Sequence, residues 1–192
     1  MGDYHIYLFR HGQTFYNKNK VFTGWKDSKL TPEGIKQAKN LGELLRNKKI
    51  DIAYKSPLSR SKDTLKEVIK FHPECKNIFT DKRIIERSYG SLAGKTHNEV
   101  LIKLGQEQFD KWHRGFNDRP PKGESFKDVE KRVKPFINDL IKKIKKEKVN
   151  VAISAHGNSI RLFRKIMEKA SIKECVTWKI PYDEYFHYVI KS

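Results

Sequence analysis

Short apolar runs alternate with amphipathic segments along this chain, and that alternation limits its fold more than any other feature. The runs that predict strands cover residues 4–9, 51–56, 78–80, 149–155 and 185–190. Apolar residues at helical spacing predict helices that begin at Pro32 and Pro57, cover Asn98–Gly105 and Glu107–Arg114, extend from Ser125 towards Lys146, and follow the fourth strand over residues 158–170. This order favours an α/β fold: a three-layer α/β/α sandwich with a mainly parallel sheet and helices on both faces.

Two of the predicted helices open with the same local pattern. Thr31 and Ser56 each precede a proline, so each is predicted to be an N-cap whose hydroxyl accepts a backbone N–H, with proline in the first helical position. Pro135 lies inside the long helix that begins at Ser125, where we expect a kink because proline has no amide hydrogen.

The length of the chain fits one domain. Single cores grow to ~250 residues before chains divide, and this chain has 192. We therefore expect one domain over residues 1–192, in which residues 96–124 form an insertion that covers the carboxyl edge of the sheet as a lid. No stretch approaches the ~20 apolar residues that span a bilayer, and no apolar leader precedes the first strand. These features predict a cytoplasmic protein without a membrane partner.

Positive charge dominates the composition. Lys and Arg number 41 against 23 Asp and Glu, which gives a formal net charge of +18. This excess predicts attraction to anions, although a solvated lysine-rich surface explains the bulk of it equally well. The lysines are spread along the chain and no nucleic-acid motif interleaves them with aromatic residues, so we expect no nucleic-acid partner.

The cysteines and acidic residues show no metal-binding spacing. Cys75 and Cys175 belong to no CxxC or Cys/His pattern, so both are predicted to be reduced thiols. The chain also lacks an Asp/Glu cluster with magnesium spacing and a phosphate-binding GxxxxGKS or GxxxxGKT loop. We therefore expect no metal site.

Two predicted strands end in a histidine followed by a glycine. His11-Gly12 follows the first strand, and His156-Gly157 follows the fourth. If both strands are central and parallel, both imidazoles lie at the same edge of the sheet, where ligands bind in folds of this kind. Each glycine permits a sharp turn and a close approach of the backbone to a ligand. One such histidine is more often structural, but the repeated arrangement favours a functional site.

The residues around His11 suit the transfer of a phosphoryl group. A neutral imidazole is a nucleophile when its other ring nitrogen donates to a fixed acceptor, and His11 is our candidate. Arg10 and Arg60 provide guanidinium groups that bind phosphate in a bidentate manner, and Arg60 lies near the first turn of the second predicted helix. Phosphoryl transfer depends mainly on positioning and on neutralising the equatorial oxygens, which arginines can do without a metal ion.

Seven segments of the chain together resemble the histidine phosphatase superfamily, and within it the cofactor-dependent phosphoglycerate mutases. The segments are "RHGQTFYN", "VFTGW", "SPLSRSKDT", "ERSYGSLAG", "WHRGF", "SAHGNSIR" and "PKGES". The last of these is also similar to the related fructose-bisphosphatases. The likeness extends over nearly the whole chain and implies the α/β/α fold of the phosphoglycerate mutases.

The resemblance implies a role for each matching residue. His11 would carry the phosphoryl group, His156 would stabilise that group during transfer, and Glu86 would be the general acid and base. The phosphate would be held by Arg10, Asn17 and Arg60. The substrate pocket would include Thr23, Gly24, Tyr89, Arg114, Gly157 and Asn158. Without the resemblance, Glu86 could equally be a surface ion-pair partner of Arg87.

The chain departs from the mutase pattern at two basic positions. His97 aligns with a lysine that follows the acid/base loop, with Lys95 near enough to replace it, and His113 precedes Arg114 where the mutases have paired arginines. Neutral histidines at these positions would weaken the recognition of anions. The segment after "WHRGF" is shorter than in the well-known bacterial and animal mutases, and the sequence ends soon after its last strand, without the tail that helps those enzymes exclude water. We therefore expect a reduced lid.

The resemblance implies phosphoglycerate mutase activity, a step of glycolysis and gluconeogenesis. The enzyme would interconvert 3-phosphoglycerate and 2-phosphoglycerate through a phosphohistidine, with 2,3-bisphosphoglycerate as the phosphoryl primer and a small phosphorylated carboxylate as the substrate. The alternative is a phosphomonoesterase of the same superfamily, in which water takes the phosphoryl group; exclusion of water separates the two activities. A non-catalytic sensor of phosphorylated ligands is a third hypothesis, which the complete set of catalytic residues argues against. A homo-oligomer is compatible with the sequence.

Overall fold

The computed structural model of the chain describes residues 2–191. Its strands are β1 (Asp3–Arg10), β2 (Ile52–Lys55), β3 (Asn77–Thr80), β4 (Val151–Ala155) and β5 (Tyr185–Lys191). Its α-helices are α1 (Phe15–Lys18), α2 (Pro32–Leu45), α3 (Ser59–Ile69), α4 (His97–Arg114), α5 (Phe126–Glu147), α6 (Gly157–Met167) and α7 (Ile172–Thr177). The short 3-10 helices η1 (Lys82–Ile84) and η2 (Gly90–Leu92) lie between β3 and α4.

The strands of the described chain form one sheet in the order β3-β2-β4-β1-β5. β4 pairs in parallel with β1 and β2, and β2 pairs in parallel with β3, whereas β5 runs antiparallel along β1. The prediction of a mainly parallel sheet is therefore confirmed. Because Arg10 lies opposite Ala155 where β1 and β4 end, the residues that follow them, His11 and His156, come to the same edge of the sheet, as predicted.

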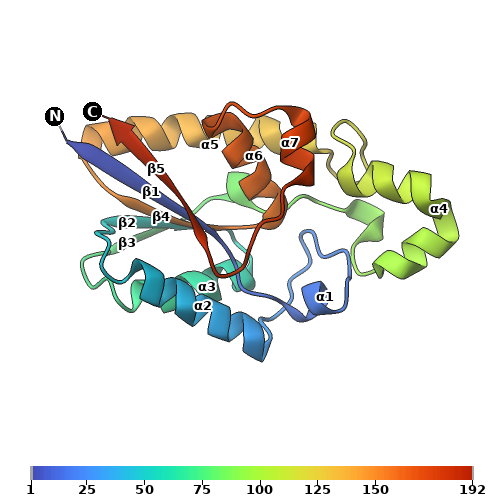
Figure 1. The fold of residues 1–192 in the computed structure, drawn as a ribbon, viewed down its shortest axis with the longest axis horizontal. Helices are drawn as coiled ribbons and strands as arrows, with labels where there is room; N and C mark the ends of the chain where they lie inside the picture. The colour runs from blue at the N-terminus through green and yellow to red at the C-terminus, as the bar shows by residue number, and fades with distance from the viewer. Residues whose placement is uncertain (1, 192) are drawn as a thin grey trace.

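Alternate side chains of β1 pack on opposite faces of the sheet, because successive residues of a strand point to opposite sides. Ile6 and Leu8 join an apolar cluster with residues of α5 and α6, whereas Tyr7 and Phe9 join a cluster with residues of α2 and α3. Figure 1 shows the result: α2 and α3 cover one face of the sheet, and α5 and α6 cover the other. This arrangement confirms the predicted three-layer sandwich.

The start of α2 packs closely against the loop that follows β1. Thr31 is the N-cap, as predicted, and its hydroxyl accepts a hydrogen bond from the Gly34 amide at 3.0 Å. A Cβ atom on Gly12 would collide with the backbone carbonyl of Gly34, so only glycine permits this contact. From the sequence, Gly12 was expected to permit close approach of the backbone to a ligand. In the structure, the close approach that requires glycine is to the start of α2.

The predicted start of the second helix is wrong by two residues. α3 begins at Ser59 with Leu58 as its N-cap, and no side chain caps it. The Ser56 hydroxyl is used elsewhere: it accepts a hydrogen bond from the Leu58 amide at 3.2 Å and lies 2.7 Å from Nε2 of His156. Ser56 therefore contributes to the surroundings of a predicted catalytic residue rather than to the helix.

The structure agrees in part with what the sequence predicted for the interiors of the longer helices. The predicted separation between two helices appears inside α4 at Gly105, whose φ of 78° is outside the helical region. α5 continues through Pro135 to Glu147. The sequence did not predict α1 and α7, which are short and begin at capping boxes formed by Thr14 and Asn17 and by Ser171 and Glu174. Within residues 2–191, no helix has the length and apolar character needed to cross a bilayer.

Candidate active site

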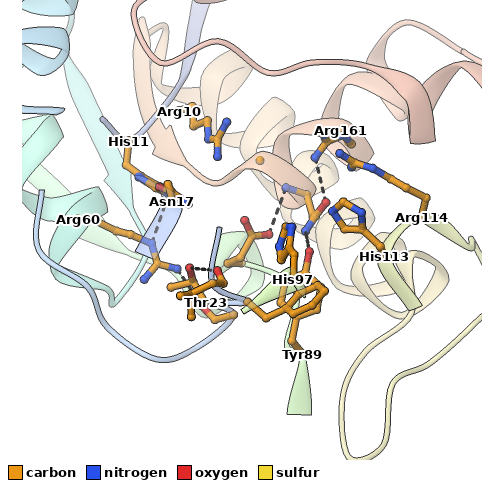
Figure 2. Close-up of a pocket in the computed structure, with 16 residues that line it drawn as sticks. Arg10, His11, Asn17, Thr23, Arg60, Tyr89, His97, His113, Arg114 and Arg161 are labelled. Carbon is orange, nitrogen blue, oxygen red and sulfur yellow. Dashed lines mark hydrogen bonds between the residues drawn. The ribbon is translucent and has the colours of Figure 1, made fainter. Parts of the chain in front are cut away.

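A cavity opens at the carboxyl edge of the central strands, next to the start of α6 and both ends of α4 (Figure 2). Its volume of about 170 Å³ is below the ~300–1,000 Å³ of pockets for drug-sized ligands, so it suits a small metabolite. The lining residues are Arg10, His11, Asn17, Val21, Phe22, Thr23, Gly24, Arg60, Glu86, Tyr89, His97, His113, Arg114, Gly157, Asn158 and Arg161. Every residue predicted for the site lines this cavity except His156, whose buried ring lies beside that of His11.

The His11 ring is held as one tautomer. The side chain is 2% exposed, and its Nδ1 atom lies 2.7 Å from the carbonyl oxygen of Gly12. Because a carbonyl oxygen only accepts, Nδ1 carries the hydrogen and Nε2 is the unprotonated nitrogen. Nε of Arg60 donates to this Nε2 atom at 3.3 Å. Burial and then the charges of Arg60 and Arg10 hold the pKa of His11 well below its usual value, so the ring is neutral near pH 7.

His156 supports the same neutral state. Its ring centroid is 4.9 Å from that of His11, and its Nε2 atom lies 2.7 Å from the Ser56 hydroxyl. Nδ1 is buried without a hydrogen-bond partner in the part of the chain that the structure describes. Burial, followed by the charge of Arg60, holds the pKa of His156 well below its usual value. Two adjacent neutral rings therefore stand at the end of β1 and β4.

Arg60 is fixed in place by backbone carbonyl groups. Its two terminal nitrogens donate to the carbonyl oxygens of Lys26 at 2.9 Å and Gly24 at 2.8 Å, and the side chain is 1% exposed. Burial lowers the pKa of Arg60 to about 10, so the guanidinium stays charged near pH 7. Gly24 and Thr23, both predicted for the substrate pocket, belong to the loop that holds this arginine.

Two further arginines of the cavity are held by the segment between α7 and β5. Arg10 donates to the Ile180 carbonyl at 2.8 Å, and its guanidinium lies 4.0 Å above the Tyr182 ring. Nε and one terminal nitrogen of Arg161 donate to the Trp178 carbonyl at 3.0 and 2.8 Å. The cationic groups are therefore positioned before any ligand binds.

Glu86 is a buried carboxylate whose position is fixed by backbone groups. Its Oε1 atom accepts from the amides of Arg87 at 2.7 Å and Asn158 at 3.1 Å. The Arg87 guanidinium instead donates to the carbonyl groups of Trp112 and His113, so Glu86 and Arg87 do not form the surface ion pair considered from sequence. Oε2 is left as the oxygen that can exchange a proton with a ligand.

Polar side chains complete the cavity wall. The side-chain NH₂ group of Asn158 donates to the Tyr89 hydroxyl at 3.2 Å. Oδ1 of Asn17 accepts from the Thr14 amide at 3.1 Å in the capping box of α1, so its NH₂ group is the part available to a phosphate. Gly157 is the first residue of α6 and lies against Arg10, which brings the positive end of that helix to the cavity.

Three basic residues of α4 lie on the opposite side of the cavity from His11 and Arg60 (Figure 2). His97 begins the helix, and His113 and Arg114 end it. Burial and then the charge of Arg114 lower the pKa of both histidines, to about 3 for His113. Without a ligand, these two histidines therefore supply no positive charge near pH 7, which is the neutral state that was expected to weaken the recognition of anions.

One charged residue of the cavity, Arg161, was not predicted from the sequence. Its remaining terminal nitrogen donates to Oδ1 of Asn158 at 3.0 Å, and burial lowers its pKa to about 9, so it is charged near pH 7. The signal was present in the sequence, because Asn158 and Arg161 are three residues apart on one helix and therefore lie on the same face. Val21 and Phe22 were also missed, and they provide the apolar part of the wall.

Within residues 2–191, no group of three or more His, Cys, Asp or Glu side chains is arranged to hold a metal ion. Cys75 and Cys175 are buried and form no disulfide, and burial raises the pKa of both thiols to about 11.

A neutral histidine among fixed arginines, at the carboxyl edge of a parallel sheet, defines an α/β protein with a site for anionic groups. The family is given by a sequence profile of the histidine phosphatase superfamily (branch 1), which matches residues 6–190. This chain belongs to that superfamily.

Individual relatives agree with this family. A 2,3-bisphosphoglycerate-dependent phosphoglycerate mutase from Cytophaga hutchinsonii is 37% identical over 166 residues, which cover 86% of this chain and 78% of that protein. A phosphoglycerate mutase from Schizosaccharomyces pombe is 41% identical over 162 residues, which cover 81% of this chain and 75% of that protein. A solved structure named "Mycobacterial hydrolase 1" has a TM-score of 0.85 at 22% identity, with 98% of this chain and 92% of that chain covered, and so has the same fold.

The tautomer of His11 can be tested by a pH titration. We expect the His11 ring to remain neutral with hydrogen on Nδ1 as the pH falls from about 8 through ~6.5, the usual pKa of histidine, because burial and the nearby arginines hold its own pKa well below that value. The measurement is nitrogen-15 NMR of the imidazole signals. The urea-denatured protein is the control, in which all histidines should titrate near their usual pKa. A His11 ring in the folded protein that titrates together with the denatured control would contradict the assignment.

Proposed function

We propose that this protein is a phosphoglycerate mutase that interconverts 3-phosphoglycerate and 2-phosphoglycerate, with His11 as the carrier of the phosphoryl group. The observation that carries this proposal is the unprotonated Nε2 atom of His11, in a small cavity with four arginine side chains and the carboxylate of Glu86. The relatives of 37% and 41% identity, both phosphoglycerate mutases, support the proposed activity.

The first half-reaction moves a phosphoryl group from phospho-His11, formed with the primer, to 3-phosphoglycerate. The free hydroxyl of the substrate attacks phosphorus, the bond between phosphorus and Nε2 of His11 breaks, and the Glu86 carboxylate accepts the hydroxyl proton, which leaves a bound bisphosphate. Arg10 and Arg60 neutralise charge on the equatorial oxygens, and they cost little reorganisation because backbone carbonyl groups already hold them.

The second half-reaction reverses these steps at the other phosphoryl group of the bisphosphate. Nε2 of His11 attacks that phosphorus, the bond between phosphorus and the substrate oxygen breaks, and Glu86 returns the proton to this oxygen. 2-Phosphoglycerate is released, and the protein returns to the phosphohistidine state. His156 is proposed to stabilise the transferring group from beside His11, where the two rings are adjacent.

2,3-Bisphosphoglycerate is proposed as the primer, which supplies the first phosphoryl group when it is bound. A ligand with several anionic groups needs donors beyond those at His11. Nε of Arg10 is buried without a partner within residues 2–191, and the Arg114 side chain makes no hydrogen bond in the same range. These donors, with the NH₂ group of Asn17, are proposed to hold the phosphate and carboxylate groups of primer and substrate.

We propose further that residues 1–192 form one domain in which residues 96–124 act as a lid. Two backbone hydrogen bonds connect the start of this segment to the loop that lines the cavity. The Phe22 amide donates to the backbone carbonyl of Lys95 at 2.9 Å, and the His97 amide donates to the backbone carbonyl of Lys20 at 2.8 Å. α4 extends away from the sheet, and its interruption at Gly105 divides it into two halves (Figure 1). Closure over the ligand would exclude water from phospho-His11.

Other expectations remain predictions. They are the cytoplasmic location, the lack of a nucleic-acid partner and the homo-oligomeric state. The substrate class proposed here, a small phosphorylated carboxylate, needs none of these for its test.

The proposed activity is tested by incubating the protein with 3-phosphoglycerate and a trace of 2,3-bisphosphoglycerate while 2-phosphoglycerate and inorganic phosphate are measured together. We expect the isomer to form well ahead of free phosphate, because a mutase returns the phosphoryl group to substrate before water reaches it. Protein freed of bound phosphate esters and assayed without the primer is the control, and should isomerise slowly. Release of phosphate with little isomer would show the phosphomonoesterase instead.

A further inference from the structure

The lid contributes three basic side chains to the cavity, and they differ from the other basic side chains there. Arg60 and Arg161 donate to backbone carbonyl groups. Within residues 2–191, no hydrogen bond engages the rings of His97 and His113 or the guanidinium of Arg114, although all three line the cavity. Figure 2 shows them facing the cavity from the side opposite His11. Their hydrogen-bonding capacity is therefore available to a ligand.

The rings of His97 and His113 lie next to each other and pack against two phenylalanine rings. Their ring centroids are 5.1 Å apart, and Phe109 lies 5.6 Å from His97 and 5.1 Å from His113. Phe22 packs against both rings, at 4.3 Å from His97 and 5.9 Å from His113. This packing fixes the rings and provides no acceptor for a proton, so the pair is neutral while the cavity is empty.

The charged groups that face the pair are all cationic. Lys20, from the loop after α1, and Arg114 act on His97; Arg87, from the segment before η2, acts on His113 together with Arg114 and Arg161 of α6. These charges and burial lower the pKa of both histidines. The one carboxylate among the lining residues, Glu86, acts on Arg114 rather than on either ring. No carboxylate of the described chain therefore raises the pKa of either ring.

A ligand with a second anionic group would supply the missing negative charge. We propose that His97 and His113 form a protonation-dependent anion site, in which a ligand that carries an anionic group besides the transferred phosphoryl group binds together with uptake of a proton by this pair. The inference rests on the proposed function, because it concerns the second anionic group of that substrate class. A fixed lysine or arginine would bind the same group without a change in protonation.

The direction of the pH dependence follows from linkage. An anion next to the pair favours the charged imidazolium, so the pKa in the complex lies above that of the free protein. Between these two values the complex binds more protons than the free protein, and affinity falls as pH rises. Where uptake reaches one proton, the dissociation constant increases by about tenfold per pH unit.

The test uses 3-sulfolactate, which carries a sulfonate and a carboxylate. Both groups stay ionised above about pH 5, whereas a phosphate monoester titrates near ~6 and would obscure the count of protons. Isothermal titration calorimetry of the full chain in two buffers with different ionisation enthalpies gives the net proton uptake. We expect roughly half a proton or more per ligand at about pH 6.5, and a dissociation constant that rises with pH.

Three variants separate the pair from other groups. His97→Asn with His113→Asn should reduce proton uptake to near zero, and His97→Lys with His113→Arg should do the same while binding becomes tighter than in the unsubstituted protein at about pH 8.5. His187→Asn changes an exposed histidine of β5 and should leave the uptake unchanged. Thermal unfolding checks that each variant is folded; if a double variant is not, His97→Asn alone should still lower the uptake.

The outcomes distinguish the inference from the proposed function. Binding without proton uptake, or uptake that persists in the folded histidine variants, overturns the inference and leaves the mutase proposal intact. Failure of 3-sulfolactate to bind overturns both the inference and the proposed substrate class. Proton uptake together with a failed isomerisation assay overturns the mutase proposal alone.

Discussion

The substitution His11→Ala is expected to lower kcat for isomerisation by about 10⁴-fold or more, because no other group can accept the phosphoryl group. The protein should also lose the mass increase of one phosphoryl group after incubation with 2,3-bisphosphoglycerate. Intact-mass spectrometry and the coupled isomerisation assay measure these two effects.

The matched control for this variant is His187→Ala, an exposed histidine on β5 that lies outside the cavity. It should keep its activity and its phosphorylation. The His11→Ala protein should still bind 3-sulfolactate, because the arginines are held by backbone carbonyl groups and not by His11 alone. Phosphorylation that persists in the His11→Ala protein would show that another residue carries the phosphoryl group.

The substitution Glu86→Gln should lower kcat by about 10²–10⁴-fold, the usual contribution of a general acid and base. The amide keeps an oxygen that can accept from the backbone amides of Arg87 and Asn158, so the loop should keep its position. The cost is expected in kcat rather than in substrate binding, and steady-state kinetics with 3-phosphoglycerate separate the two.

A substrate with a different leaving group tests whether Glu86 transfers a proton. An aryl phosphate with an acidic phenol as leaving group needs no proton donor, so its reaction with His11 should be little affected by Glu86→Gln. Glu43→Gln, on the exposed surface of α2, is the control for a neutralised carboxylate. If Glu86→Gln slowed the natural and the aryl substrates equally, its role would be positional rather than that of an acid and base.

The centre of the fold could be predicted because local sequence and tertiary structure agree there. β1 and β4 are short apolar runs that each end in His-Gly, and parallel pairing of the two strands brings both histidines to one edge of the sheet. Thr31-Pro32 gives the start of α2 for the same reason: the capping residue and the fixed φ of proline both favour it. In these segments each local preference matches the position of the segment in the fold.

Features that depend on contacts between distant segments could not be predicted. Ser56-Pro57 has the same local pattern as Thr31-Pro32, but the Ser56 hydroxyl lies next to His156, which is 100 residues away in sequence, and the helix begins later. The neutrality of His113 likewise comes first from burial in the folded protein, and the distant residues Arg87 and Arg161 add to the effect of its neighbour Arg114. For such residues, the local pattern contains no information about the partner.

The last part of the chain matters to the cavity although none of its residues lines it. The carbonyl groups of Trp178 and Ile180 hold Arg161 and Arg10, and β5 then returns along β1. An engineered truncation before Trp178 would keep the proposed nucleophile, acid and phosphate ligands, yet two of its guanidinium groups would lose their acceptors. Protein engineers who shorten or fuse this end should therefore treat residues 178–191 as part of the enzyme rather than as a dispensable extension.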